Sequence, residues 1–164
     1  MKMLNNMVGD AIMSVADVLK HMEKWIGKEI FVSDWTQVTQ EQINQFADST
    51  KDHQWIHVDG EKAAKGPFGK TIAHGFLTLS HLPFFSYQAP LKFEGEKMLI
   101  NYGLDKVRFI NPVMSGSKIR DRIVLSSFEE KPDHRILMTQ THTIEIEGQE
   151  KPACVAQALT MIIF

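Results

Sequence analysis

Apolar residues near the amino terminus recur at helical spacing. They predict an amphipathic helix over residues 15–26. Ser14 is in place to cap the start of this helix, and Gly27 is expected to end it. The next stretch, residues 29–38, is rich in β-branched and aromatic side chains and predicts a strand.

A second helix is predicted over residues 40–49. Thr39 stands at the expected N-cap position, and Gln42, three positions later, completes a capping box. The helix leads into a polar stretch, residues 51–57, that we expect to form a loop. A further short helix is expected over residues 60–65, before a run of glycine and proline that breaks regular structure.

The most apolar helical segment covers residues 71–87. Its apolar side chains lie nearly all round the predicted helix, which is typical of a buried helix rather than a surface one. Pro83 falls inside the segment and should kink or stop the helix. The start is expected near Ala73, His74 and Gly75.

After Pro90 the pattern changes to four strand-like runs separated by turn signals. The third run places apolar side chains on one face and threonines on the other. The last run is apolar on both faces, as in a central strand. Helices followed by antiparallel strands predict one α+β domain over residues 1–164, with one sheet curled round one buried helix and residues 1–13 as a loose arm. The four runs are residues 98–110, 117–128, 135–147 and 152–164.

Composition limits the function classes. Of 164 residues, 43% are hydrophobic and 23% charged, and the net charge of −2 gives no reason to expect a nucleic-acid partner. The amino terminus lacks the apolar run of a signal peptide, and no segment reaches the roughly 18 apolar residues of a membrane span. The one cysteine, Cys154, excludes an internal disulfide, and its apolar surroundings favour a structural thiol over a nucleophile. We therefore expect a cytoplasmic protein.

Candidate chemistry lies in the predicted loop, at Asp52 and His57. Together these side chains can hold one water molecule, with the carboxylate accepting its proton and the imidazole orienting it. Such a pair suits the addition of water to an activated double bond, or its removal. The helix start near His74 and Gly75 offers unpaired N–H groups to a carbonyl oxygen that gains negative charge. Gly75 would also let a ligand approach the backbone closely.

Other interpretations fit the same residues. Asp and His five positions apart in a loop are common without catalysis. His53 and His57 have a spacing seen in metal sites, but no third ligand is evident and we expect no metal. The position of His74 is also compatible with a core histidine that is hydrogen-bonded to the backbone. Ser80 is also compatible with a hydroxyl group that bonds to an earlier carbonyl of its own helix. Trp55 fits a lid over a flat ligand or a packing residue.

The sequence DHQWIH at residues 52–57 resembles the hydratase-2 motif of the MaoC-like dehydratases. In that motif Asp, a variable residue, Asn, Pro, an aliphatic residue and His follow in order. Residues 72–76, IAHGF, and Ser80 resemble the same family's hot-dog helix. Gln-Trp in place of Asn-Pro, with GPFG at residues 66–69, is similar to the NodN-like branch. The likeness extends from about residue 15 to the end of the chain.

This resemblance implies a hot-dog fold, in which an antiparallel sheet wraps a central helix. It also implies (R)-specific hydration of a trans-2-enoyl thioester, usually of coenzyme A, with no cofactor beyond the coenzyme A of the substrate. By motif, Asp52 and His57 activate the water, with Asp52 the base, and the Gly75 N–H binds the thioester oxygen. The expected site comprises catalytic Asp52 and His57, substrate-binding or oxyanion residues Gly75, His74 and Ser80, and acyl-pocket residues Trp55 and Phe76.

Two departures from the family pattern affect substrate choice. Lys51 stands where a glycine commonly precedes the catalytic Asp, and its charge would favour an ionised carboxylate. Gln54 and Trp55 replace Asn-Pro, and the bulky Trp would reshape the acyl pocket. Acyl length, and coenzyme A against an acyl carrier protein, stay open.

Two other functions remain compatible with the sequence. One is a hot-dog acyl-CoA thioesterase, which would release the free thiol. The other is a non-catalytic protein that binds acyl thioesters. In each case we expect a homodimer or a dimer-based oligomer, because a curled single sheet leaves apolar area uncovered.

Overall fold

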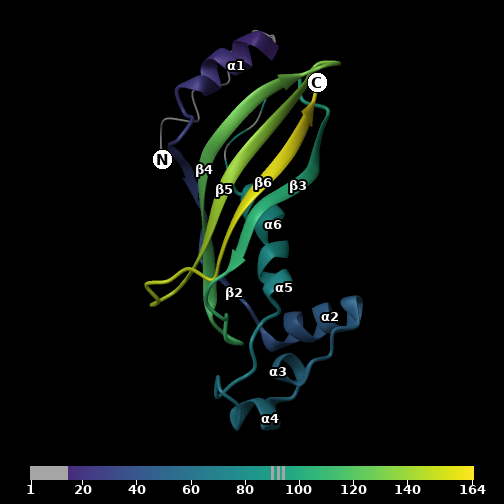
Figure 1. Ribbon diagram of the computed structural model, residues 1–164, viewed down its shortest axis with the longest axis vertical. Coiled ribbons are helices and arrows are strands. Elements are labelled where there is room, and N and C mark those ends of the chain that lie inside the picture. Colours follow the sequence, from purple (N-terminus) through teal and green to yellow (C-terminus); the bar gives the residue numbers. More distant parts are fainter. Residues whose placement is uncertain (1–14, 90, 92, 94) are drawn as a thin grey trace.

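An antiparallel sheet dominates the fold (Figure 1). The computed structural model describes residues 15–89, 91, 93 and 95–164, so the predicted arm and the Ser14 cap lie outside the described residues. The strands are β1 (Glu29–Val32), β2 (Thr36–Gln37), β3 (Met98–Phe109), β4 (Lys118–Lys131), β5 (Arg135–Ile146) and β6 (Cys154–Ile163). Their order is β1-β4-β5-β6-β3, and β2 also pairs with β4.

The strands of the second half confirm the sequence prediction. β6 lies between β5 and β3, in the central position expected from its two apolar faces. Every second side chain of β5 is buried from Ile136 to Ile146, and the threonines face the other way. Gln140 and His142 are the two polar members of that buried row.

Short helices surround the sheet. The predicted capping box is confirmed, because the Gln42 N–H donates to Thr39 Oγ1 at 3.2 Å and the Thr39 N–H donates to Gln42 Oε1 at 3.0 Å. No helix in the described ranges is long and apolar enough to cross a membrane. The helices are α1 (Val15–Glu23), α2 (Gln40–Thr50), α3 (Trp55–Val58), α4 (Gly60–Ala64), α5 (Gly75–Ser80) and α6 (Leu82–Ser86).

The buried helix begins at Gly75, which confirms the start expected near Ala73, His74 and Gly75, and it is interrupted next to Pro83 as expected. The Ala73 N–H donates to the Val113 carbonyl at 2.8 Å, which holds the backbone before Gly75 outside the helix. The segment then breaks into α5 and α6. Pro83 lies in the first turn of α6, where its missing N–H needs no partner.

Two segments differ from the prediction. The loop expected over residues 51–57 ends in a helical turn, α3, which contains His57. The strand expected over residues 29–38 is divided into β1 and β2, which pair with different parts of β4. The division of the strand comes from pairing with β4, far along the chain, whereas α3 is closed by the local bond from the Asp59 N–H to the Trp55 carbonyl.

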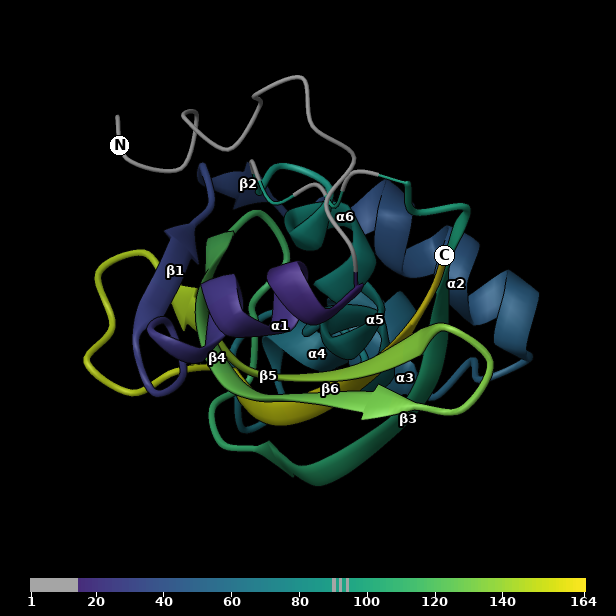
Figure 2. The same cartoon turned by 90° about the horizontal axis from the view of Figure 1, so that it is seen from above.

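The concave face of the sheet holds α5 and α6, and α1 covers one end of it (Figure 2). Two buried apolar clusters result. One packs α5 and α6 against the sheet, and the other packs α1 against β4 and its neighbours. Members of the first include Val38, Ile43, Leu77, Phe85 and Ile144, and members of the second include Val18, Met22, Ile123, Leu125 and Ile162.

One flank of the molecule exposes large apolar side chains. Phe76 on α5 is 67% exposed and Tyr87, just after α6, is 81% exposed, so the prediction that this helix is buried all round is wrong for the single chain. β3 is exposed along nearly its whole length and forms one edge of the sheet. Its exposed apolar residues are Met98, Leu99, Ile100, Tyr102, Leu104 and Phe109.

Candidate active site

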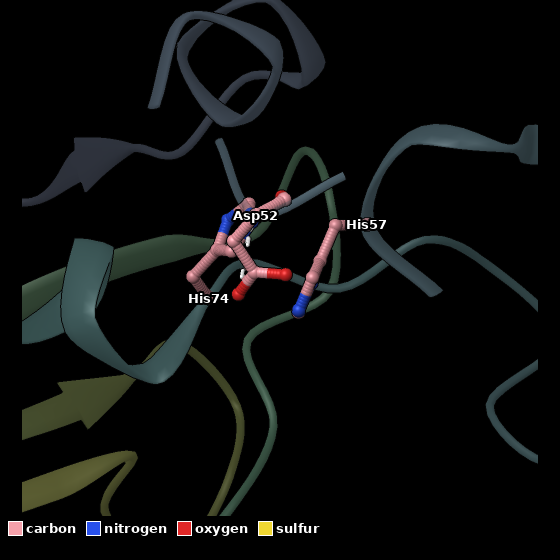
Figure 3. A group of neighbouring side chains, drawn as sticks. All are labelled: Asp52, His57 and His74. Carbon is pink, nitrogen blue, oxygen red and sulfur yellow. Dashed lines mark hydrogen bonds and ion pairs between the residues drawn. The ribbon is translucent and has the colours of Figure 1, made fainter. Parts of the chain in front are cut away.

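Asp52, His57 and His74 come together from three segments of the chain (Figure 3). Asp52 follows the end of α2, His57 lies in α3, and His74 is the N-cap residue of α5. One carboxylate or imidazole atom from each lies within 4.8 Å of the others. The structure therefore groups three of the residues that the sequence singled out.

His57 is buried and held in one orientation. Its Nδ1 donates to the Ile72 carbonyl at 2.7 Å, so Nε2 is the nitrogen left for a ligand. Burial lowers the pKa of His57. The Ile72 hydrogen bond and nearby Asp52 oppose this effect, and His74 adds to it. The ring is consequently neutral near pH 7, with a lone pair on Nε2.

His74 positions both other residues. Its Nε2 donates to the backbone carbonyl of Asp52 at 2.9 Å and lies 4.0 Å from Oδ2 of the same residue. Its ring stacks on His57 with a centroid distance of 3.7 Å. His74 is therefore a core histidine bonded to the backbone, and it also lies beside Asp52 and His57.

Gly75 is the first residue of α5. The side chain of His74 makes no capping bond, so it leaves the first N–H groups of the helix open. A Cβ at position 75 would lie 3.0 Å from Cγ of Phe109. Contact with the Phe109 ring is therefore a second reason for glycine, besides the approach of a ligand.

The remaining predicted site residues lie around this centre. Ser80 is exposed, and its hydroxyl donates to the Phe76 carbonyl at 2.7 Å, so its role toward Asp52 or His57 stays a prediction. The Trp55 ring packs over Gly66 and beneath the Lys62 ammonium group. Phe76 meets Phe109 edge-on at 5.6 Å between ring centroids.

The hydrogen bonds favour a water molecule over a metal ion at this centre. His57 Nδ1 and His74 Nε2 already donate to backbone carbonyls, which leaves Nε2 of His57 and the Asp52 carboxylate facing the site. His53 is paired with Asp48 at 2.8 Å and does not act together with His57 as the metal interpretation required.

A cavity of about 550 Å³ begins beside Leu79 and Ser80, one helical turn beyond Gly75. It lies between the helices α5 and α6 and the strands β3, β5 and β6. Neither Trp55 nor Phe76, the predicted acyl-pocket residues, is among the residues that line it. Its inner surface is formed mainly by apolar residues such as Leu82, Leu91, Phe93, Leu104, Met138 and Leu159.

Sequence reasoning missed a second pair of Asp and His, buried inside the sheet. His142 Nδ1 and Asp121 Oδ2 are 2.6 Å apart, and neither side chain is more than 1% exposed. Burial raises the pKa of Asp121, and the hydrogen bond to His142 opposes that rise. The available signal was a polar residue at an inward position of an alternating apolar strand, in β4 and again in β5.

Cys154 lies close to this buried pair. It is fully buried, and burial together with the nearby Asp121 charge raises the pKa of its thiol to about 11. The thiol is therefore uncharged and inert at neutral pH. This confirms the interpretation of a buried structural cysteine.

An antiparallel sheet wrapped round a central helix is the hot-dog arrangement expected from the sequence. The chain belongs to the MaoC like domain family, whose profile matches residues 13–147. It is therefore an enzyme of the hydro-lyase class, as the motif predicted.

Two curated relatives cover nearly all of the chain. The 3-hydroxyacyl-thioester dehydratase Z of Mycobacterium tuberculosis is 49% identical over 84% of this chain and 90% of its own length. Nodulation protein N of Rhizobium leguminosarum bv. viciae is 45% identical over 93% of this chain and 92% of its own. The second relative confirms the predicted NodN-like branch.

A solved structure shares the fold. It is the monoamine oxidase regulatory protein from Archaeoglobus fulgius, with a TM-score of 0.72 and 28% identity. The match covers 84% of this chain and 89% of that chain. Together with the family match, it confirms the predicted α+β hot-dog fold.

Proposed function

We propose that the protein catalyses the reversible hydration of a trans-2-enoyl thioester to the (R)-3-hydroxyacyl thioester. The observation that carries the proposal is the Asp52 carboxylate close to the neutral ring of His57, beside His74 at the N-cap of α5. The hydratase-2 motif and the 3-hydroxyacyl-thioester relative support this substrate class.

In the hydration direction, one water molecule lies between Asp52 and Nε2 of His57. Its O–H bond breaks as Asp52 takes the proton and the oxygen bonds to C3 of the enoyl group. The electron pair of the double bond moves toward the thioester oxygen. It returns to C2 as the protonated Asp52 gives up its proton there, which completes the addition of water and restores the carboxylate. Because the pKa of His57 is lowered, its Nε2 accepts a hydrogen bond from the water and orients it.

The thioester oxygen gains negative charge in this reaction and needs a donor. The Gly75 N–H has no partner within α5, because it belongs to the first residue of that helix. Its donation to the thioester oxygen stabilises the charge where it develops. α5 has six residues, so the individual N–H group, rather than a long helix dipole, provides the effect.

We infer that the acting form is a homodimer. β3 is an edge strand with unpaired backbone groups and exposed Leu99, Tyr102 and Leu104. Phe76 joins this strand to the exposed face of α5 through its contact with Phe109. A second copy of the chain would cover both surfaces.

Light scattering at micromolar concentration tests the dimer. We expect twice the 18.7 kDa chain mass, and the single-chain mass for Leu104→Lys. Thr139→Lys places the same charge on the outer face of β5 and should stay dimeric. A monomeric wild type would contradict the inference.

The reaction is tested with crotonyl-coenzyme A and a series of longer enoyl thioesters. Loss of the conjugated absorbance is followed together with a thiol reagent. We expect absorbance loss without thiol release, reduced on the order of 10²–10⁴-fold in Asp52→Asn. Asp48→Asn, on the exposed side of α2, is the matched control and should keep wild-type turnover.

Three outcomes would overturn the proposed reaction or its assignment to Asp52. Thiol release would identify a thioesterase. Unchanged turnover in a folded Asp52→Asn protein would remove this residue from the chemistry. Binding of the thioesters with no turnover at any acyl length would favour the non-catalytic binding protein.

A further inference from the structure

The cavity beside α5 and α6 combines an apolar wall with polar groups on its floor. The wall comes from the helices and β3, through residues such as Leu79, Leu82 and Leu104. On β5, Gln140 and His142 line the cavity from the sheet side. An apolar chain would fill the wall, but it would leave these two polar side chains without partners.

In the described part of the chain, only one ring nitrogen of His142 has a hydrogen-bond partner. Its Nδ1 is engaged by Asp121 at 2.6 Å, and its Nε2 is buried without a hydrogen-bond partner among the described residues. Because His142 lines the cavity, Nε2 is the ring nitrogen available to a molecule inside it. A buried polar atom without a hydrogen bond destabilises the fold, so a ligand that forms a hydrogen bond with Nε2 would bind favourably.

Gln140 adds a second polar group on the same face. It lies two residues before His142 in β5, so both side chains point to the concave side of the sheet. It is 5% exposed, and no hydrogen bond joins its side chain to another residue in the described part of the chain. Its amide offers both donors and an acceptor.

Strand register places this floor at a distance from the reacting carbons. Phe109, which packs on Gly75, pairs with Cys154, and Cys154 pairs with Ile144. His142 is two residues farther along β5, about 7 Å from that level. A group that reaches it must sit several carbons beyond the double bond of the substrate.

We propose that the preferred substrate is an enoyl thioester whose acyl chain carries a hydroxyl group, which His142 and Gln140 bind in this cavity. The proposal rests on the proposed hydration reaction and specifies its substrate class. Asp121 is a positioning residue, because it fixes the His142 ring without lining the cavity.

A hydroxyl group fits these partners better than a carbonyl group does. Nε2 of His142 accepts a hydrogen bond when Nδ1 carries the only ring proton, and it donates one when both nitrogens are protonated. A hydroxyl group can meet either state, whereas a ketone can only accept. The Gln140 amide has the same dual capacity and can bind the remaining side of the hydroxyl group.

The test compares kcat/KM for trans-2-decenoyl-coenzyme A with its derivatives hydroxylated at successive positions toward the chain end. A matched ketone series accompanies them. We expect one hydroxylated position to exceed the unsubstituted chain about tenfold or more, and the corresponding ketone to lack this advantage. Crotonyl-coenzyme A turnover by the wild type separately reports whether the proposed reaction itself holds.

Gln140→Leu leaves the buried Asp121–His142 pair intact. It should reduce the ratio of kcat/KM for the hydroxylated chain to kcat/KM for the unsubstituted chain toward unity. The double variant Asp121→Asn, His142→Phe removes the ring without leaving an unpaired buried carboxylate and should also abolish the preference. Thr139→Val, next to Gln140 on the outer face of β5, should keep the wild-type ratio. The ratio within each variant is insensitive to a general loss of turnover.

Crotonyl-coenzyme A turnover with equal or lower kcat/KM for every hydroxylated chain would overturn this inference and leave the reaction standing. A preference for the ketone series, or a hydroxyl preference that survives in both floor variants, would also overturn it. Absence of turnover with all thioesters would overturn the proposed function and this inference with it.

Discussion

Gly75→Ala adds one methyl group at the point where the site meets the sheet. The new Cβ would lie 3.0 Å from Cγ of Phe109 and 3.1 Å from its two Cδ atoms. Carbon atoms in good contact are about 3.5–4.0 Å apart, so the ring must move by about half an ångström or more. Both the stability of the fold and the position of the Gly75 N–H depend on that movement.

The size of the effect follows from two opposed contributions. Overpacking of this kind costs about 1–3 kcal/mol. Replacing glycine by alanine at a compatible backbone angle stabilises by about 0.4–1 kcal/mol through the unfolded chain. Because the Phe109 ring is partly exposed and can shift, we expect Gly75→Ala to lower the free energy of unfolding by about 1 kcal/mol.

A double-mutant cycle separates the clash from any other effect. In a Phe109→Ala background, Gly75→Ala should be neutral or stabilising by up to about 1 kcal/mol, because the clash has gone. Gly60→Ala is the matched control. Gly60 is also the first residue of a helix, α4, but an added Cβ there meets nothing within 4 Å.

Urea unfolding at one fixed protein concentration gives these free energies, since an oligomer's stability depends on concentration. Crotonyl-coenzyme A turnover of Gly75→Ala, alone and with Phe109→Ala, shows whether the displaced ring also disturbs the site. Equal destabilisation of Gly75→Ala in both backgrounds would refute the role assigned to Phe109.

Two further predictions follow from the geometry around Asp52. Lys51 is the C-cap of α2 at φ 65°, a left-handed conformation that favours glycine. Lys51→Gly should therefore raise the free energy of unfolding by about 0.5–1 kcal/mol in urea melts. A loss of stability would contradict this prediction. The lowered pKa of His57 means that the unfolded chain binds a proton at a pH where the folded chain does not. The contribution of His57 to stability is therefore present above pH 6.5 and is lost as the pH falls from there toward the lowered pKa of the folded protein. For the same reason, kcat/KM should fall at acid pH with a midpoint below 6.5. An acid limb centred above 6.5 would contradict a neutral, buried His57.

Local signals allowed most of the fold to be predicted. The capping box at Thr39 and the period of two in β5 each depend on residues close in sequence, and both are confirmed. The start of α5 was predicted, but the division of residues 29–38 into β1 and β2 was not, because their hydrogen-bond partners in β4 lie more than 80 positions away. Propensity cannot include a hydrogen-bond partner at that distance.

The sequence predicted that Asp52, His57 and His74 would lie near one another, but it did not predict how their side chains are oriented. The DHQWIH motif identified Asp52 and His57, and the structure brings them together with His74. Which nitrogen of His57 faces the site depends on the Ile72 carbonyl, 15 residues away. The cavity floor at Gln140 and His142 follows from the packing of three strands against α5 and α6, and no motif marks it.

The chain contains two pairs of Asp and His in opposite environments, and this difference decides their roles. Asp52 is 55% exposed and its partner ring keeps one nitrogen open, so water and a substrate can reach both groups. Asp121 and His142 are buried and bonded at 2.6 Å, so the carboxylate cannot meet a reacting atom. In the proposed reaction, proton transfer to the substrate is therefore assigned to the first pair. In the proposed substrate complex, the second pair acts through Nε2 of His142, as a fixed hydrogen-bonding group at the floor of the cavity.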